Sequence, residues 1–241
     1  MDERFDSGSF RALIIEHERA TPGGLLYDWL DGRHAEVENL RIDVDDREVD
    51  PTGYDLVVPL GSESAAYDDA IPWIEREKRL LARAADADVP ILAICFGAQL
   101  LARVLGGRCY RAEASEIGWL PVRTRDAQLV PEGPWFQWHF DTFTVPEGAT
   151  ALAETDLGPQ AYVIGRSLGV QFHPEVTSAI VKAWVRGYRH DDGADRDGLE
   201  LDALLRETHE RAESARESSR RLFDTYLERV ARLMRRERVD A

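Results

Sequence analysis

The sequence predicts an α/β fold in which a mostly parallel central sheet carries helices on both faces. In the first part of the chain, short apolar runs of strand length alternate with longer segments of helical spacing. This alternation is typical of parallel strands joined by crossover helices. The chain has 241 residues, 44% of them hydrophobic, which is enough to bury one sizeable core in a single domain.

The elements of the first part follow from their apolar runs and from the turn residues between them. An apolar run at residues 12–15 predicts the first strand, and the turn Pro22-Gly23-Gly24 precedes a helix at 25–30. Further apolar runs predict three more strands, and a segment with one charged face predicts a second helix. These strands are expected at residues 37–44, 56–60 and 89–94, and the helix at 71–85.

After Gly107 the pattern changes to several short β segments, which predicts antiparallel additions to the sheet. We expect these segments at residues 108–111, 119–124, 136–139, 143–145 and 161–164, followed by a last strand at 169–172. In open sheets of this class, ligands bind beyond the carboxyl ends of the strands. The residues that follow the strands ending at 94 and 172 are therefore candidates for a site.

The C-terminal part differs in character, and we divide the chain at residue 190. Residues 1–190 are expected to form the main domain, and residues 191–241 a charged linker with a helical extension. Apolar residues at three-four spacing predict helical structure from 199 to about 236, with an almost wholly polar middle. We expect two helices, or one helix with a solvated centre, to pack on the same domain. A dimerisation or partner-docking helix is the less favoured alternative.

Composition restricts the partners and the compartment. The formal net charge is −15, with 45 acidic and 30 basic residues, which disfavours nucleic acid or an anionic membrane as a partner. Two cysteines are too few for a disulfide framework, and no apolar stretch approaches the length of a membrane span. We expect a cytoplasmic protein, and the oligomeric state stays open.

The most informative segment runs from Pro90 to Leu101, where an apolar strand ends at Cys95 and passes through Gly97 into a helix. Such a strand-turn-helix resembles a nucleophile elbow, in which small flanking residues let the backbones approach closely. Taken alone, Cys95 is better explained as a small apolar residue at a buried strand end.

A second segment favours the catalytic interpretation of Cys95 over the structural one. The apolar stretch Ser167 to Phe172 runs directly into His173-Pro174-Glu175. A thiol nucleophile needs a base, and the base needs a group that orients it, which are the roles open to His173 and Glu175. Pro174 biases His173 toward an extended conformation, so both polar side chains can project from one corner. Together the two segments predict a Cys-His-Glu triad.

At this point the chain resembles the class I glutamine amidotransferases, and among them the glutaminase domains similar to that of GMP synthase. The resemblance rests on segments that occur in the family's order and cover residues from about 12 to 190. These are Cys95-Phe96-Gly97-Ala98-Gln99, Leu105-Gly106-Gly107, Glu116-Ile117-Gly118-Trp119, Gln137-Trp138-His139-Phe140-Asp141 and Gln171-Phe172-His173-Pro174-Glu175. It implies a flavodoxin-like fold and hydrolysis of the glutamine side-chain amide through a thioester on Cys95.

The resemblance also implies an oxyanion hole, for which the Phe96 amide is well placed at the start of its helix. A second donor is expected from the loop after the third strand. The family usually has Gly-Gly-Pro there, whereas this chain has Gly61-Ser62-Glu63. The departure puts the rigidity of that loop in question, and a lost donor costs on the order of a hundredfold in turnover.

For substrate binding, the resemblance implies Gln99, His139, Phe140 and Asp141. A structural role, as a hydrogen-bonded histidine beside Trp138, is an equal alternative for His139. The remaining histidines, His17, His34, His190 and His209, lack metal-ligand spacing, so we expect no metal and no cofactor.

Three functions remain at this stage. The first is a glutaminase that delivers ammonia to a separate synthase, because the chain has no phosphate-binding glycine loop. The second is a free-standing amidase of γ-glutamyl or other small amides. The third is a non-catalytic regulatory homologue, which the intact triad disfavours.

Overall fold

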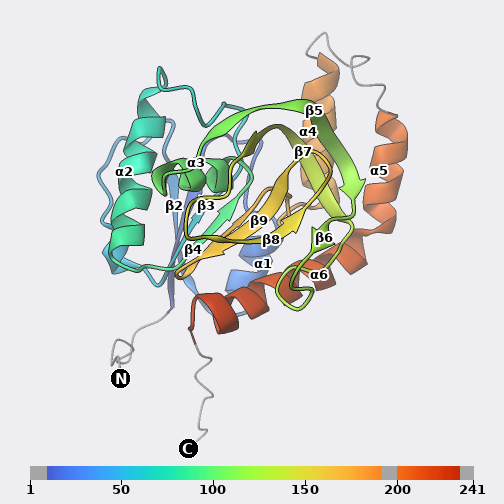
Figure 1. The fold of residues 1–241 in the computed structure, drawn as a ribbon. Coiled ribbons are helices and arrows are strands. Elements are labelled where there is room, and N and C mark those ends of the chain that lie inside the picture. The colour runs from blue at the N-terminus through green and yellow to red at the C-terminus, as the bar shows by residue number, and fades with distance from the viewer. Residues whose placement is uncertain (1–9, 191–199, 234–241) are drawn as a thin grey trace, which may run out of the picture.

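The computed structural model describes residues 10–190 and 200–233. Within these ranges, ten strands form an eight-stranded sheet and a separate two-stranded sheet (Figure 1). The strands are β1 (Arg11–Glu16), β2 (Glu36–Arg41), β3 (Leu56–Pro59), β4 (Ile91–Ile94), β5 (Cys109–Leu120), β6 (Arg123–Thr124), β7 (Trp135–Phe143), β8 (Thr150–Glu154), β9 (Pro159–Ile164) and β10 (Ser167–Val170). The α-helices are α1 (Leu25–Asp31), α2 (Pro72–Asp86), α3 (Phe96–Val104), α4 (Ser178–His190), α5 (Leu201–Glu210) and α6 (Ala212–Thr225). Short helical turns cover Pro51–Gly53 and Tyr226–Val230.

The large sheet has the strand order β2-β1-β3-β4-β10-β9-β8-β6. The pairs from β2 to β10 are parallel, and the pairs from β10 through β9 and β8 to β6 are antiparallel. The predicted α/β class with antiparallel additions is therefore confirmed. Strands β4 and β10 lie side by side, although a long segment of the chain separates them.

Two hydrophobic clusters lie on opposite faces of this sheet because the strand side chains alternate between them. In β1, Ala12 and Ile14 belong to the cluster covered by α1 and α6, whereas Leu13 and Ile15 belong to the cluster covered by α2 and α3. A third cluster joins α4 and α5 to the β5-β7 ribbon. Figure 1 shows α4 and α5 next to each other at this side of the molecule.

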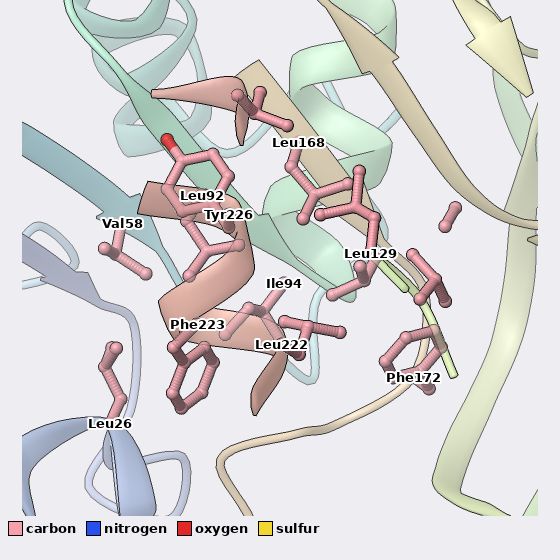
Figure 2. Packing of buried hydrophobic residues seen from close by; sticks show 14 of the residues in the cluster. Leu26, Val58, Leu92, Ile94, Leu129, Leu168, Phe172, Leu222, Phe223 and Tyr226 are labelled. Carbon is pink, nitrogen blue, oxygen red and sulfur yellow. The ribbon is translucent and has the colours of Figure 1, made fainter. Parts of the chain in front are cut away.

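The C-terminal helices pack on the rest of the protein. Leu222, Phe223 and Tyr226 are fully buried in the cluster that also holds Leu26 of α1 and Val58 of β3 (Figure 2). The helical pattern predicted from 199 to 236 is divided into α5 and α6 at residue 211, with a π-helical turn after α6. The predicted linker at 191–198 lies outside the described residues.

Several elements differ from those expected from the sequence. The predicted segments 108–111 and 119–124 contribute mainly to one long strand, β5, and residues 143–145 form no separate strand. Strand β8 and helix α4 were not predicted. The β5-β7 pairing is irregular between Arg111 and Glu116, where the alternation of exposed and buried residues is lost. No helix of the described residues has the length and apolarity that crossing a membrane requires.

Candidate active site

Cys95 lies between β4 and α3 in a strained backbone conformation. Its φ is 52° and its ψ is −110°, values that a residue with a Cβ rarely adopts. The turn is tight because a methyl group added at Gly97 would lie 2.2 Å from the Pro59 carbonyl oxygen. Only glycine allows this approach of α3 to β3. The geometry is that of a nucleophile elbow at the carboxyl end of the sheet.

His173 and Glu175 follow the neighbouring strand β10. The Cys95 amide donates to the Val170 carbonyl at 2.8 Å, which ties the elbow to the end of β10. His173 Nδ1 lies 2.7 Å from Glu175 Oε1, and both side chains are almost fully buried. The structure therefore brings together the three residues of the predicted triad.

The surroundings of His173 favour its protonated form. Burial alone lowers the pKa of His173, but the nearby Glu175 carboxylate and the Cys95 sulfur outweigh burial and raise that pKa to about 10. Nε2 of His173 is buried and has no hydrogen-bond partner among the described residues, so it is free to exchange a proton with a reacting group. The His173 ring makes a T-shaped contact with the ring of Trp184 of α4, with the centroids 4.9 Å apart.

Helix α1 holds the backbone beside Glu175. The Leu25 amide, at the start of α1, donates to the Glu175 carbonyl at 2.8 Å. Gly24 has a φ of 44°, and a Cβ there would lie 2.1 Å from the same carbonyl oxygen. The Pro22-Gly23-Gly24 turn is thus required by a close contact with the site.

The loop after β3 lies directly against the predicted triad. A Cβ added at Gly61 would be 3.1 Å from His173 Cε1 and 3.8 Å from Cys95 Cβ. The Phe96 amide is the first of α3 and has no acceptor within its own helix. The structure therefore places Gly61 beside Cys95 and His173, and the Gly97 amide donates to the Leu60 carbonyl at 3.0 Å, which ties the start of α3 to this loop. The oxyanion role of Phe96, Gly61 and Ser62 stays a prediction.

One carboxylate, that of Glu18, and one imidazole, that of His17, contact this loop, in which the family usually has Gly-Gly-Pro. Ser62 Oγ donates to Glu18 Oε1 at 2.7 Å, and the Glu63 amide lies 3.3 Å from the same oxygen. The His17 ring nitrogen Nδ1 lies 3.0 Å from the Gly61 carbonyl oxygen. The departure of Ser62 and Glu63 from the family pattern is therefore accompanied by side-chain anchors for the loop.

The predicted substrate residues divide into two groups. Gln99 Nε2 donates to the Asp141 carbonyl at 3.1 Å, and His139 Nδ1 lies 3.0 Å from the same carbonyl. These three residues therefore meet at one backbone oxygen. Phe140 is separate from this polar cluster, and its ring lies under the guanidinium of Arg111.

From the sequence, no role was assigned to Gln171, which links this cluster to Cys95. Its Nε2 lies 3.7 Å from Cys95 Sγ, and its Oε1 accepts from Gln99 Nε2 at 3.2 Å. Glu116, Gln137 and Gln160 extend the buried polar network on the far side of His139. Glu116, Gln137 and Gln171 each begin one of the segments on which the family resemblance rests, and this is the sequence signal by which they could have been found.

The second cysteine has a different environment. Burial, the largest influence, raises the pKa of the Cys109 thiol to about 12. Cys109 packs in the cluster beneath α2 and α3. A thiol of this pKa is protonated at neutral pH and is a poor nucleophile.

Comparisons with known proteins bear on the family of the chain. A family model described as glutamine amidotransferase class-I matches residues 25–183. The glutamine-hydrolyzing GMP synthase of Thermus thermophilus is 39% identical over 136 residues, which are 52% of this chain and 27% of that protein. That of a Synechococcus species is 32% identical over 157 residues, 61% of this chain and 28% of that protein. The chain thus spans about a quarter of the length of these curated relatives.

Two solved structures resemble the fold of this chain over most of its length. A glutamine amidotransferase from Thermotoga maritima is 28% identical, with a TM-score of 0.82, and the match covers 92% of this chain and 99% of that one. A glutamine amido transferase from Methylobacillus flagellatus has a TM-score of 0.84 at 23% identity, covering 97% and 99% of the two chains. The second likeness shows the fold alone.

Proposed function

Because the chain belongs to the class I glutamine amidotransferase family, we propose that it hydrolyses the side-chain amide of glutamine to glutamate and ammonia. The reaction passes through a thioester on Cys95. The observation that carries the proposal is the elbow at Cys95, placed beside a buried His173 that Glu175 holds at 2.7 Å. A strained cysteine next to an oriented imidazole has the geometry of covalent amide hydrolysis.

In the acylation step, the Cys95 thiolate attacks the carbon of the substrate carboxamide. The Phe96 and Ser62 amides donate hydrogen bonds that stabilise the negative charge forming on the carboxamide oxygen. The carbon-nitrogen bond then breaks, and the departing nitrogen takes the proton of His173 Nε2, so ammonia leaves and the thioester remains.

In the deacylation step, His173 takes a proton from water, and the resulting hydroxide attacks the thioester carbon. The carbon-sulfur bond breaks, glutamate leaves, and the proton on His173 again faces the Cys95 thiolate. Glu175 keeps the Nδ1 hydrogen of His173 directed toward itself in both steps, which leaves Nε2 for the reacting groups.

The polar cluster beside Cys95 is proposed to bind the substrate. Gln99, His139 and the backbone of Asp141 would hold the amino-acid end of glutamine. Gln171, which lies between Gln99 and the sulfur, would contact the substrate nearer the scissile amide.

We further propose that the released ammonia is used by a separate synthase. In the relatives named GMP synthase, the region that matches this chain is only about a quarter of a longer protein, which supports an ammonia acceptor distinct from the amidotransferase part.

The test uses the purified full chain with glutamine and a panel of γ-glutamyl amides. Ammonia release and covalent labelling by a glutamine-mimicking electrophile are expected for the wild type, both lost in Cys95→Ala. Cys109→Ala is the matched control and is expected to keep both. Unchanged turnover in Cys95→Ala would refute the mechanism. Turnover of other γ-glutamyl amides without glutamine would instead support a free-standing amidase.

A further inference from the structure

A buried histidine-carboxylate pair lies beneath the loop that carries Gly61, outside the residues used in the proposed mechanism. His17 directly follows β1, and Glu77 lies on α2. His17 Nε2 is 2.7 Å from Glu77 Oε2, and both side chains have no solvent exposure. The other ring nitrogen, Nδ1, is the one that lies 3.0 Å from the Gly61 carbonyl oxygen.

Both nitrogens of this ring face oxygen atoms that can accept a hydrogen bond, one on the Glu77 carboxylate and one on the Gly61 carbonyl. Burial lowers the pKa of His17, but the Glu77 carboxylate outweighs it, with smaller contributions from Glu18 and the Gly61 carbonyl, so that the pKa is raised. The ring can therefore donate to Glu77 and to Gly61 at the same time. The rings of Trp73 and Phe96 pack against it, with centroids 5.1 and 4.8 Å away.

Stability alone is a poor explanation for this pair. Removing a carboxylate and an imidazolium from water costs several kcal/mol per ion, and well-packed apolar residues are often at least as stable. One carboxylate oxygen, Glu77 Oε1, is buried without a hydrogen-bond partner among the described residues. A buried charged pair with an incomplete set of partners is more easily explained by what it holds in position.

The peptide between Gly61 and Ser62 is what the pair holds. In a planar trans peptide, the carbonyl and the following N–H point in opposite directions. Because the Gly61 carbonyl faces His17, the Ser62 N–H faces away from it, and it has no hydrogen-bond partner among the described residues. Gly61 itself lies against Cys95 and His173.

We propose that His17, held by Glu77, is a positioning residue that fixes the orientation of the Gly61–Ser62 peptide so that the Ser62 N–H stays available to the oxyanion. The inference rests on the proposed function, because it assigns a purpose to a donor of the same reaction. The next residue in the chain after His17, Glu18, accepts a hydrogen bond from Ser62 Oγ at 2.7 Å and anchors the same loop.

Two substitutions at one position separate the two contacts of the ring. His17→Asn places its amide nitrogen near the position of Nδ1 and can still donate to Gly61. His17→Gln places its amide near the position of Nε2 and can still pair with Glu77, but it loses the donor to Gly61. Both remove the same imidazole from the same buried space, so each serves as the control for the other.

Turnover and substrate affinity are measured for both variants. We expect kcat to fall about a hundredfold in His17→Gln, the cost of one oxyanion donor, with KM within about twofold of wild type. His17→Asn is expected to keep at least tenfold more of the wild-type kcat. Equal kcat values in the two variants, or losses that follow their melting temperatures, would refute the positioning role.

A second measurement does not depend on turnover. Amide hydrogen exchange in residues 61–64 of the full chain is expected to rise in His17→Gln and to stay near wild type in His17→Asn. If neither variant folds, Glu77→Asp keeps the charge but shortens its reach, and it should lower kcat with KM unchanged. Wild-type protein that turns over no glutamine would refute the proposed function, whereas equal exchange in the two variants would refute the peptide anchor alone.

Discussion

Replacing Gly61 with alanine adds one methyl group at the point where the loop after β3 contacts His173. The new Cβ would lie 3.1 Å from His173 Cε1 and 3.8 Å from Cys95 Cβ. The first distance is shorter than the 3.5–4.0 Å of an ordinary carbon-carbon contact, by roughly 0.5 Å. The ring or the loop must therefore move by about that amount.

The size of the effect follows from this displacement. A misplacement of about 1 Å in a reacting group can cost roughly a hundredfold in rate. If the activation free energy rises in proportion to the displacement, a shift of about 0.5 Å costs about tenfold in rate, or ~1.4 kcal/mol. The free energy of unfolding should hardly change. Gly61 is not among the residues with a positive φ, so alanine fits its backbone and restricts the unfolded chain, which offsets the tight contact.

The assay compares kcat for glutamine hydrolysis and the midpoint of urea unfolding in Gly61→Ala and in Gly53→Ala. Gly53 precedes β3, at the opposite end of the same strand, and a Cβ there would make only an ordinary 3.6 Å contact with Arg11. We expect the tenfold loss in Gly61→Ala alone. Wild-type kcat in Gly61→Ala, or an equal loss in Gly53→Ala, would show that the reasoning about this contact is wrong.

Three further outcomes are expected. Glu175→Gln should lower ammonia release about 10³-fold because the carboxylate no longer orients and supports the imidazolium, and a loss below tenfold would contradict that role. Phe223→Ala should lower the free energy of unfolding by about 3–5 kcal/mol in urea titrations, whereas Arg221→Ala on the exposed side of α6 should change it by less than about 0.5 kcal/mol. The folded pKa of His173 is raised to about 10 from 6.5, so its contribution to stability is complete below pH 6.5 and falls as the pH rises toward 10. The difference in free energy of unfolding between wild type and His173→Gln should therefore shrink over that interval, and a constant difference would contradict the raised pKa.

The parts of the site that could be predicted from the sequence are those whose signal is local. The strand-to-helix passage at Cys95 and the His173-Pro174-Glu175 corner each lie within a few consecutive residues. The rule that ligands gather at the carboxyl ends of parallel strands was then sufficient to place the two segments together.

The parts that could not be predicted depend on partners distant in sequence. A buried histidine such as His17 has no pattern of its own, and its meaning comes from Glu77, which is 60 residues away. Gln171 likewise acquires a possible function only from its contacts with Cys95 and Gln99. The long strand β5 was missed because pairing with β7 stabilises residues whose own alternation is interrupted between Arg111 and Glu116.

The side-by-side placement of β4 and β10 has a consequence for how such a protein can diversify. Cys95 and His173, the proposed nucleophile and base, follow adjacent strands, and the β5-β7 ribbon and the strands β6, β8 and β9 lie in the chain between them. Because His139 and Asp141 lie on β7, changes in this segment would alter the proposed substrate contacts, while the pairing of β4 with β10 would still hold the ends of these two strands side by side. The proposed reacting groups and the proposed substrate contacts on β7 therefore lie in different parts of the chain, so one set can change while the other is kept.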